Sequence, residues 1–129
     1  MFTNAETILQ EHQYPNNEKK EFIDAVSYLE TELPENEYTE FKNATLNVRE
    51  KILFKDLKDT VESKMKKYSN VNIYSQNYPN VEPNRQIYFF TTVLDSQKQI
   101  DVKYILVDAE TKDILFKGTE FTLKRGKSW

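Results

Sequence analysis

The 129-residue chain has no cysteine, one histidine, two glycines and four prolines. Without cysteine it can form neither a disulfide nor a thiolate metal site. A Ser–His–Asp triad would have to use the single histidine, His12, which we expect to be a surface residue at the end of a helix. Gly118 and Gly126 belong to no glycine-rich loop that could hold a phosphate. These absences favour a non-catalytic protein without a cofactor or a metal.

Long apolar runs are also missing. No stretch approaches the roughly 18 apolar residues that cross a membrane. The first six residues lack the basic patch and apolar core of a signal peptide. At 13% aromatic residues the chain is too rich in large apolar side chains to be disordered. We therefore expect one cytoplasmic domain, residues 1–129, without contact to a membrane.

The strongest positive signal is a meander of three antiparallel strands over residues 86–94, 100–108 and 114–123. In the middle strand, apolar residues from Ile100 to Leu106 fill every second position, which predicts one wholly apolar face. The other face begins charged and ends apolar. Asp108 and Asp113 flank the last connection, where acidic residues usually stabilise the turn. Gly118 inside the third strand indicates a bulge or a close backbone approach.

Helical spacing of apolar residues predicts helices before this sheet. A short helix is expected at 4–11, and a second at 18–32 with Asn17 as its N-cap. A helical stretch over 37–68 follows, either as one helix or broken near 54–56. Residues 71–75 are predicted to add a fourth, edge strand. The expected fold is therefore α+β: a helical part (4–68) packed on a three- to four-stranded antiparallel sheet (71–123), followed by a basic tail (124–129).

Charge is distributed unevenly along the chain. Residues 1–40 hold ten acids and two lysines, whereas residues 41–129 hold eleven acids and sixteen bases, so charges of −8 and +5 give the formal net charge of −3. The acids are densest around a predicted corner at Leu33 and Pro34: Glu30, Glu32, Glu35, Glu37 and Glu40. Such a surface can bind a basic protein, or imitate nucleic acid in a groove meant for phosphates. It is also what an ordinary solvated corner between helices looks like.

Two further surfaces are candidates for binding. Tyr88 and Ile105 belong to the second face of the sheet, which we expect to be open and to form a protein interface, a homodimer contact or the wall of a pocket. The tail carries Lys124, Arg125, Lys127 and Trp129, the combination of cations and an aromatic ring that binds single-stranded nucleic acid. A pI near 5.3 argues against a nucleic-acid partner.

The segment from Tyr104 to Leu115 resembles the strand–turn–strand hairpin of small cystatin-like and peptidase-propeptide-like domains. Those domains usually have glycine where this chain has Asp113. The resemblance implies a small domain with a curved antiparallel sheet. The composition, rich in Asn, Lys, Ile and Tyr, is typical of low-GC bacteria, their phages and plasmids.

From these features we predict a small protein-binding module, an inhibitor or adaptor of bacterial or mobile-element origin. It would act through its acidic or aromatic surface, in one version by nucleic-acid mimicry. The first alternative is a cystatin- or NTF2-like domain that binds a small ligand, or acts on it, in a pocket between helix and sheet. The second is single-strand nucleic-acid binding through the tail.

Overall fold

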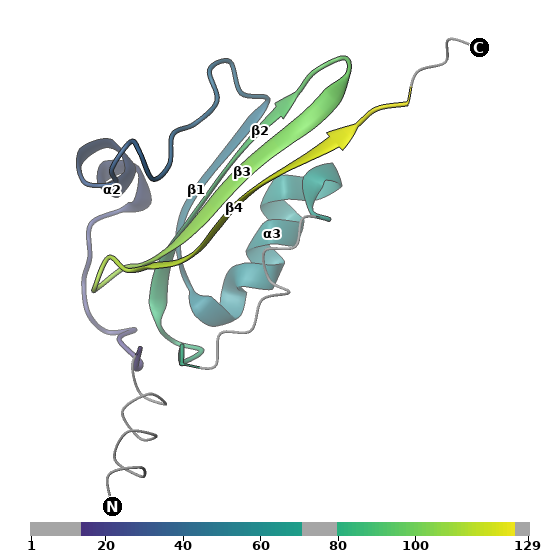
Figure 1. The fold of residues 1–129 in the computed structure, drawn as a ribbon. Helices are drawn as coiled ribbons and strands as arrows, with labels where there is room; N and C mark the ends of the chain where they lie inside the picture. Colours follow the sequence, from purple (N-terminus) through teal and green to yellow (C-terminus); the bar gives the residue numbers. More distant parts are fainter. Residues whose placement is uncertain (1–13, 71–79, 126–129) are drawn as a thin grey trace, which may run out of the picture.

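The computed structural model describes residues 14–70 and 80–125 and shows an α+β domain built on a four-stranded antiparallel sheet (Figure 1). The strands lie in chain order across the sheet: β1 (Leu46–Leu53), β2 (Gln86–Asp95), β3 (Gln99–Asp108) and β4 (Ile114–Leu123). The helices are α2 (Ala25–Thr31) and α3 (Leu57–Met65), and the short 3₁₀ turns η1 (Phe54–Asp56) and η2 (Lys66–Tyr68) flank α3. No helix in the described ranges is long and apolar enough to span a membrane.

Strands β2 to β4 confirm the predicted meander, with bounds that differ by at most one residue at each end. The turn between β3 and β4 confirms the role expected of Asp108, because its carboxylate accepts hydrogen bonds from the backbone N–H groups of Glu110 and Thr111. Gly118 lies directly opposite Tyr104, whose ring covers the glycine. The group that closely approaches Gly118 is thus a side chain and not the backbone predicted there, and the irregularity in pairing falls earlier in β4, opposite Leu106 and Val107.

The prediction of helix over 37–68 is wrong in its first half, because residues 46–53 form strand β1. Val48 and Ile52 are four positions apart, a spacing that puts two side chains on one face of a helix but also on one face of a strand. The pairing partner decides between the two. β1 supplies the hydrogen-bonding neighbour that the second edge of β2 needs, with Val48 opposite Thr91. The break expected near 54–56 coincides with η1, and the second half of the stretch is α3.

The predicted helix over 18–32 is much shorter than expected. Only residues 25–31 are helical, and the N-cap is Asp24, whose side chain accepts a hydrogen bond from the backbone N–H of Ser27. Asn17 is not a cap. Its side-chain oxygen accepts a hydrogen bond from the Gln86 N–H at 2.7 Å, so its side chain is used for a tertiary contact. The predicted helix at 4–11 and strand at 71–75 lie outside the described residues.

Each face of the sheet is covered over part of its area, and α2 and α3 lie on opposite sides of it (Figure 1). On the first face Val61 and Met65 of α3 pack on Phe89 and Leu106, which confirms the predicted apolar row of β3. On the second face Tyr28, Leu33 and Tyr38 form a second cluster with residues of β2 and β3. Burial on both faces explains why every position of β2 from Gln86 to Val93 is buried.

A buried ion pair joins the residue before β2 to the last residue of β3. Arg85 and Asp108 form two hydrogen bonds of 2.6 and 2.8 Å, and their side chains are 3% and 0% exposed. Arg85 also donates to the carbonyl of Pro15 at 3.0 Å, and its guanidinium lies 5.5 Å from the Tyr14 ring centroid. Together with the contact between Asn17 and Gln86, these bonds hold residues 14–17 against one end of the sheet.

Candidate functional site

The acidic corner is defined by the five glutamates of the predicted acidic run, and its backbone follows from Leu33 and Pro34. Leu33 is buried, and its N–H still donates to the Tyr28 carbonyl as α2 ends. Pro34 cannot continue the helix, and its carbonyl accepts hydrogen bonds from Glu37 and Tyr38 in the turn that follows. The chain then runs extended across the second face of the sheet. The structure thus spreads the five acids over a helix end, a turn and an extended segment.

Two acids of the corner are neutralised by partners on the sheet. Glu37 forms an ion pair of 2.6 Å with Lys117 of β4. Glu40 accepts two hydrogen bonds, of 2.6 and 2.7 Å, from Arg49 of β1, and this contact raises the pKa of the arginine.

The other three acids of the corner, Glu30, Glu32 and Glu35, are exposed and have no ion pair within the described part of the chain. They are the members of the predicted run that keep an uncompensated negative charge.

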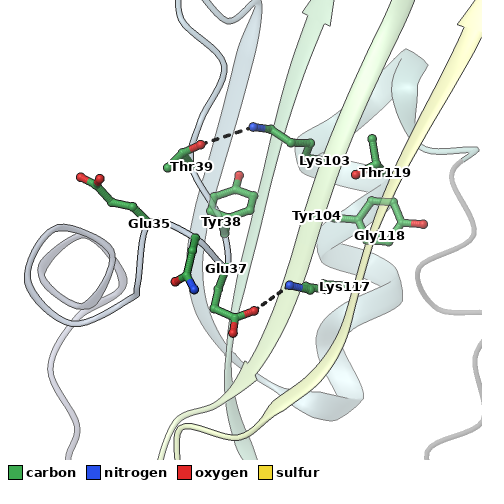
Figure 2. A pocket seen from close by; sticks show the side chains of 10 residues that line it. Glu35, Glu37, Tyr38, Thr39, Lys103, Tyr104, Lys117, Gly118 and Thr119 are labelled. Atoms are coloured by element: carbon green, nitrogen blue, oxygen red, sulfur yellow. Dashed lines mark hydrogen bonds and ion pairs between the residues drawn. The ribbon is translucent and has the colours of Figure 1, made fainter.

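An open groove of about 350 Å³ lies between residues 35–39 and strands β3 and β4. Figure 2 shows the acidic segment facing Lys103 and Lys117 across it. The Lys103 ammonium lies 4.5 Å from the centroid of the Phe41 ring. The groove is lined by ten residues: Glu35, Asn36, Glu37, Tyr38, Thr39, Lys103, Tyr104, Lys117, Gly118 and Thr119. The volume is at the low end for ligand sites, which are also usually more apolar.

Tyr38 lines this groove with a side chain that is 6% exposed. Its hydroxyl is buried and has no hydrogen-bond partner among the described residues, and burial raises its pKa well above the usual value. The ring packs against Phe90 with 6.0 Å between centroids. A buried hydroxyl without a partner costs free energy, since it has lost its bonds to water.

Tyr38→Phe is therefore expected to raise the free energy of unfolding by about 1 kcal/mol, because it removes the unpaired hydroxyl and keeps the ring. Urea denaturation of the two proteins measures the difference. Tyr28→Phe, in the same cluster, is the comparison for loss of a hydroxyl. A loss of stability in Tyr38→Phe would show that the hydroxyl has a partner in solution.

The expectation of an open second face is wrong where Tyr88 and Ile105 lie, since both side chains are fully buried. Tyr28 of α2 stacks on Tyr88 with 4.4 Å between ring centroids and 3° between planes. The Tyr88 hydroxyl donates to the Ile23 carbonyl at 2.7 Å. Neither Tyr88 nor Ile105 can contact a partner without displacing α2 and the segment after it.

A hollow of about 120 Å³ lies between η2 and strands β3 and β4. Between α3 itself and the sheet, the described residues leave no pocket of the kind expected. Val61, Met65 and Phe89 are fully buried and fill that space. The groove beside the acidic corner is therefore outside the layer where a pocket was expected. Lys103 and Lys117 were not predicted as groove residues. That both lysines lie on one face of the sheet follows from the alternation of side chains along β3 and β4. The sequence does not show that residues 35–39 cross that face.

The basic tail is described only at its start. Lys124 forms an ion pair with Asp95, and Arg125 is exposed. Lys127 and Trp129 lie outside the described residues, as does His12. Residues 14–70 and 80–125 contain no cluster of three His, Cys, Asp or Glu side chains that could hold a metal ion.

Comparisons of the chain with protein-family models, with curated proteins and with solved structures found no match. The geometry of its surfaces therefore carries the functional argument.

Proposed function

We propose that this protein is a non-catalytic protein-binding module, an inhibitor or adaptor that binds a basic partner through its acidic corner. The observation that carries the proposal is the set of three exposed acids, Glu30, Glu32 and Glu35, that form no ion pair with any described residue. Exposed Ile23 and Val26, at 42% and 40%, belong to α2 and the residues that lead into it. Carboxylates beside exposed apolar side chains suit a protein surface that is both basic and apolar.

Charge and apolar contact have separate roles in this proposal. The carboxylates attract a basic partner at long range, and salt weakens that attraction because the acids are exposed. Burial of Ile23 and Val26 would supply the part of the affinity that persists at high salt. A protein that normally binds nucleic acid is one kind of basic partner that this surface suits, which is the mimicry version of the proposal.

The experiment is affinity capture from a low-GC bacterial lysate at low and high salt, with the captured protein identified by mass spectrometry. We expect a stoichiometric partner whose binding falls at high salt. Glu32→Gln with Glu35→Gln should then weaken binding of that partner at least about tenfold, since two unscreened charges are lost. Isothermal titration with the purified partner measures the loss.

The matched control is Asp59→Asn with Glu62→Gln, which removes two exposed acids from α3 on the opposite side of the sheet. Its affinity should equal that of the wild-type protein. If both double variants bind equally well, the acidic corner is not the binding surface. If nothing is captured at either salt concentration, the proposal fails.

A second candidate function, binding of a small charged ligand, is favoured by the groove itself. Lys103 and the exposed Glu35 present opposite charges there, as a zwitterionic ligand would require. This candidate predicts no captured protein, and a thermal shift with small zwitterions that is lost in Lys103→Ala.

A further inference from the structure

Strand β4 is the outer edge of the sheet in the described residues, and its second half has backbone groups free to pair. The N–H of Lys124 donates to the carbonyl of Lys98, so the backbone of residue 124 is directed toward β3. Backbone direction alternates along an antiparallel strand. Thr119, Phe121 and Leu123 therefore direct their N–H and C=O groups away from β3, where another strand can bind them.

The same half of β4 has the most exposed large apolar side chains among the described residues. Phe121 and Leu123 are 64% and 66% exposed. Both side chains belong to the second face of the sheet, at the end that α2 leaves uncovered (Figure 1). A free edge with exposed apolar side chains favours pairing with another strand.

The first half of β4 is less suited to pairing. Its register shifts opposite Leu106 and Val107, an irregularity that disturbs a strand edge. Lys117 forms an ion pair with Glu37 of residues 35–39, which line the groove (Figure 2). The edge available to a partner therefore begins near Thr119.

We propose that residues 119–125 pair with the same residues of a second copy, in antiparallel register about a two-fold axis at Thr122. The axis must be perpendicular to the sheet, so equivalent faces of the two copies lie on the same side. Phe121 of each copy then lies opposite Leu123 of the other, and these four apolar side chains form one cluster. Glu120 of each copy lies opposite Lys124 of the other, which places unlike charges together.

Self-complementarity favours a second copy over an unrelated strand. The outward-directed residues 121 and 123 meet each other in this register, so each such pair can form two backbone hydrogen bonds. An axis at Phe121 would instead place Lys117 opposite Arg125. An axis at Glu120 would place two glutamates opposite each other. An axis at Thr119 would extend the pairing into the irregular first half of β4.

Because the chain has no cysteine, single cysteines test this register directly. In the proposed dimer Thr122 lies opposite itself in a non-hydrogen-bonded pair, with about 4.5 Å between Cα atoms, within the range of a disulfide. Thr122→Cys should therefore form a disulfide-linked dimer rapidly with diamide. Thr119→Cys is the matched control, since its two copies would be about 20 Å apart along the strands. It should remain a monomer under the same conditions.

Sedimentation of the wild-type protein tests the dimer without any added cysteine. Its mass should rise with concentration from 15.4 kDa toward twice that value. Phe121→Lys with Leu123→Lys should sediment as a monomer at every concentration. Its melting temperature should equal that of the wild-type protein at concentrations where the latter is monomeric, because both side chains are exposed in the single chain.

Three results would overturn the proposal: a wild-type protein that stays monomeric at millimolar concentration, a dimer that persists in the double-lysine variant, or cross-linking at Thr119 as fast as at Thr122. The proposal does not depend on the acidic corner, so the double variant of Glu32 and Glu35 should dimerise normally.

Discussion

Asp108→Asn should lower the free energy of unfolding by about 3–5 kcal/mol, the usual loss when one partner of a buried ion pair is removed. Asp108 is completely buried and forms two hydrogen bonds with Arg85. Asparagine keeps the shape but not the charge, so the guanidinium would remain buried with only the more exposed Glu110, 3.3 Å away, as a counter-ion. A loss of this size is a large part of the stability of a typical domain. Urea denaturation with an unchanged m-value measures it.

The matched control is Asp113→Asn, in the same hairpin. Asp113 is exposed, and its carboxylate accepts a hydrogen bond from the Tyr14 hydroxyl at 2.9 Å. Its replacement should cost less than about 1 kcal/mol, because water can replace the partner. Equal losses in the two variants would show that the pair of Arg85 and Asp108 stabilises the fold no more than a surface contact does.

Gly118→Ala should destabilise the protein by about 1–3 kcal/mol, because the added methyl group has no room. A Cβ atom at Gly118 would lie 2.6 Å from the hydroxyl oxygen of Tyr104, and 2.8 Å from its Cε1 and Cζ atoms. The ring cannot move away freely. It stacks on Phe116 with 5.6 Å between centroids, and its hydroxyl donates to Glu120 at 2.8 Å.

A double-mutant cycle tests the cause of this loss. In a Tyr104→Val background, Gly118→Ala should cost much less, because the ring that meets the methyl group is gone. Thr119→Ala, at the neighbouring exposed position, should change stability little in either background. If Gly118→Ala costs the same with and without the Tyr104 ring, the close contact is not the reason for glycine at this position.

The sequence predicts where the acids of the acidic corner are concentrated, but not which of them form ion pairs. The density of acids from Glu30 to Glu40 is visible in the sequence, and so is the interruption at Pro34. Glu37 and Glu40 are paired because Lys117 of β4 and Arg49 of β1 lie beside them. Glu35 has no such partner among the described residues. The Glu37–Lys117 pair joins positions 80 residues apart. No local pattern indicates such a partner.

The sequence by itself determined the meander from β2 to β4, because strand alternation is a local property that each strand shows alone. It also determined the turn role of Asp108. Only the tertiary structure decided that residues 46–53 form a strand, since a spacing of four suits both a helix and a strand. It also decided that Asn17 binds Gln86 instead of capping a helix, and that Tyr88 and Ile105 are covered. These outcomes depend on which distant segment supplies the neighbour, and periodicity along the chain contains no information about that neighbour.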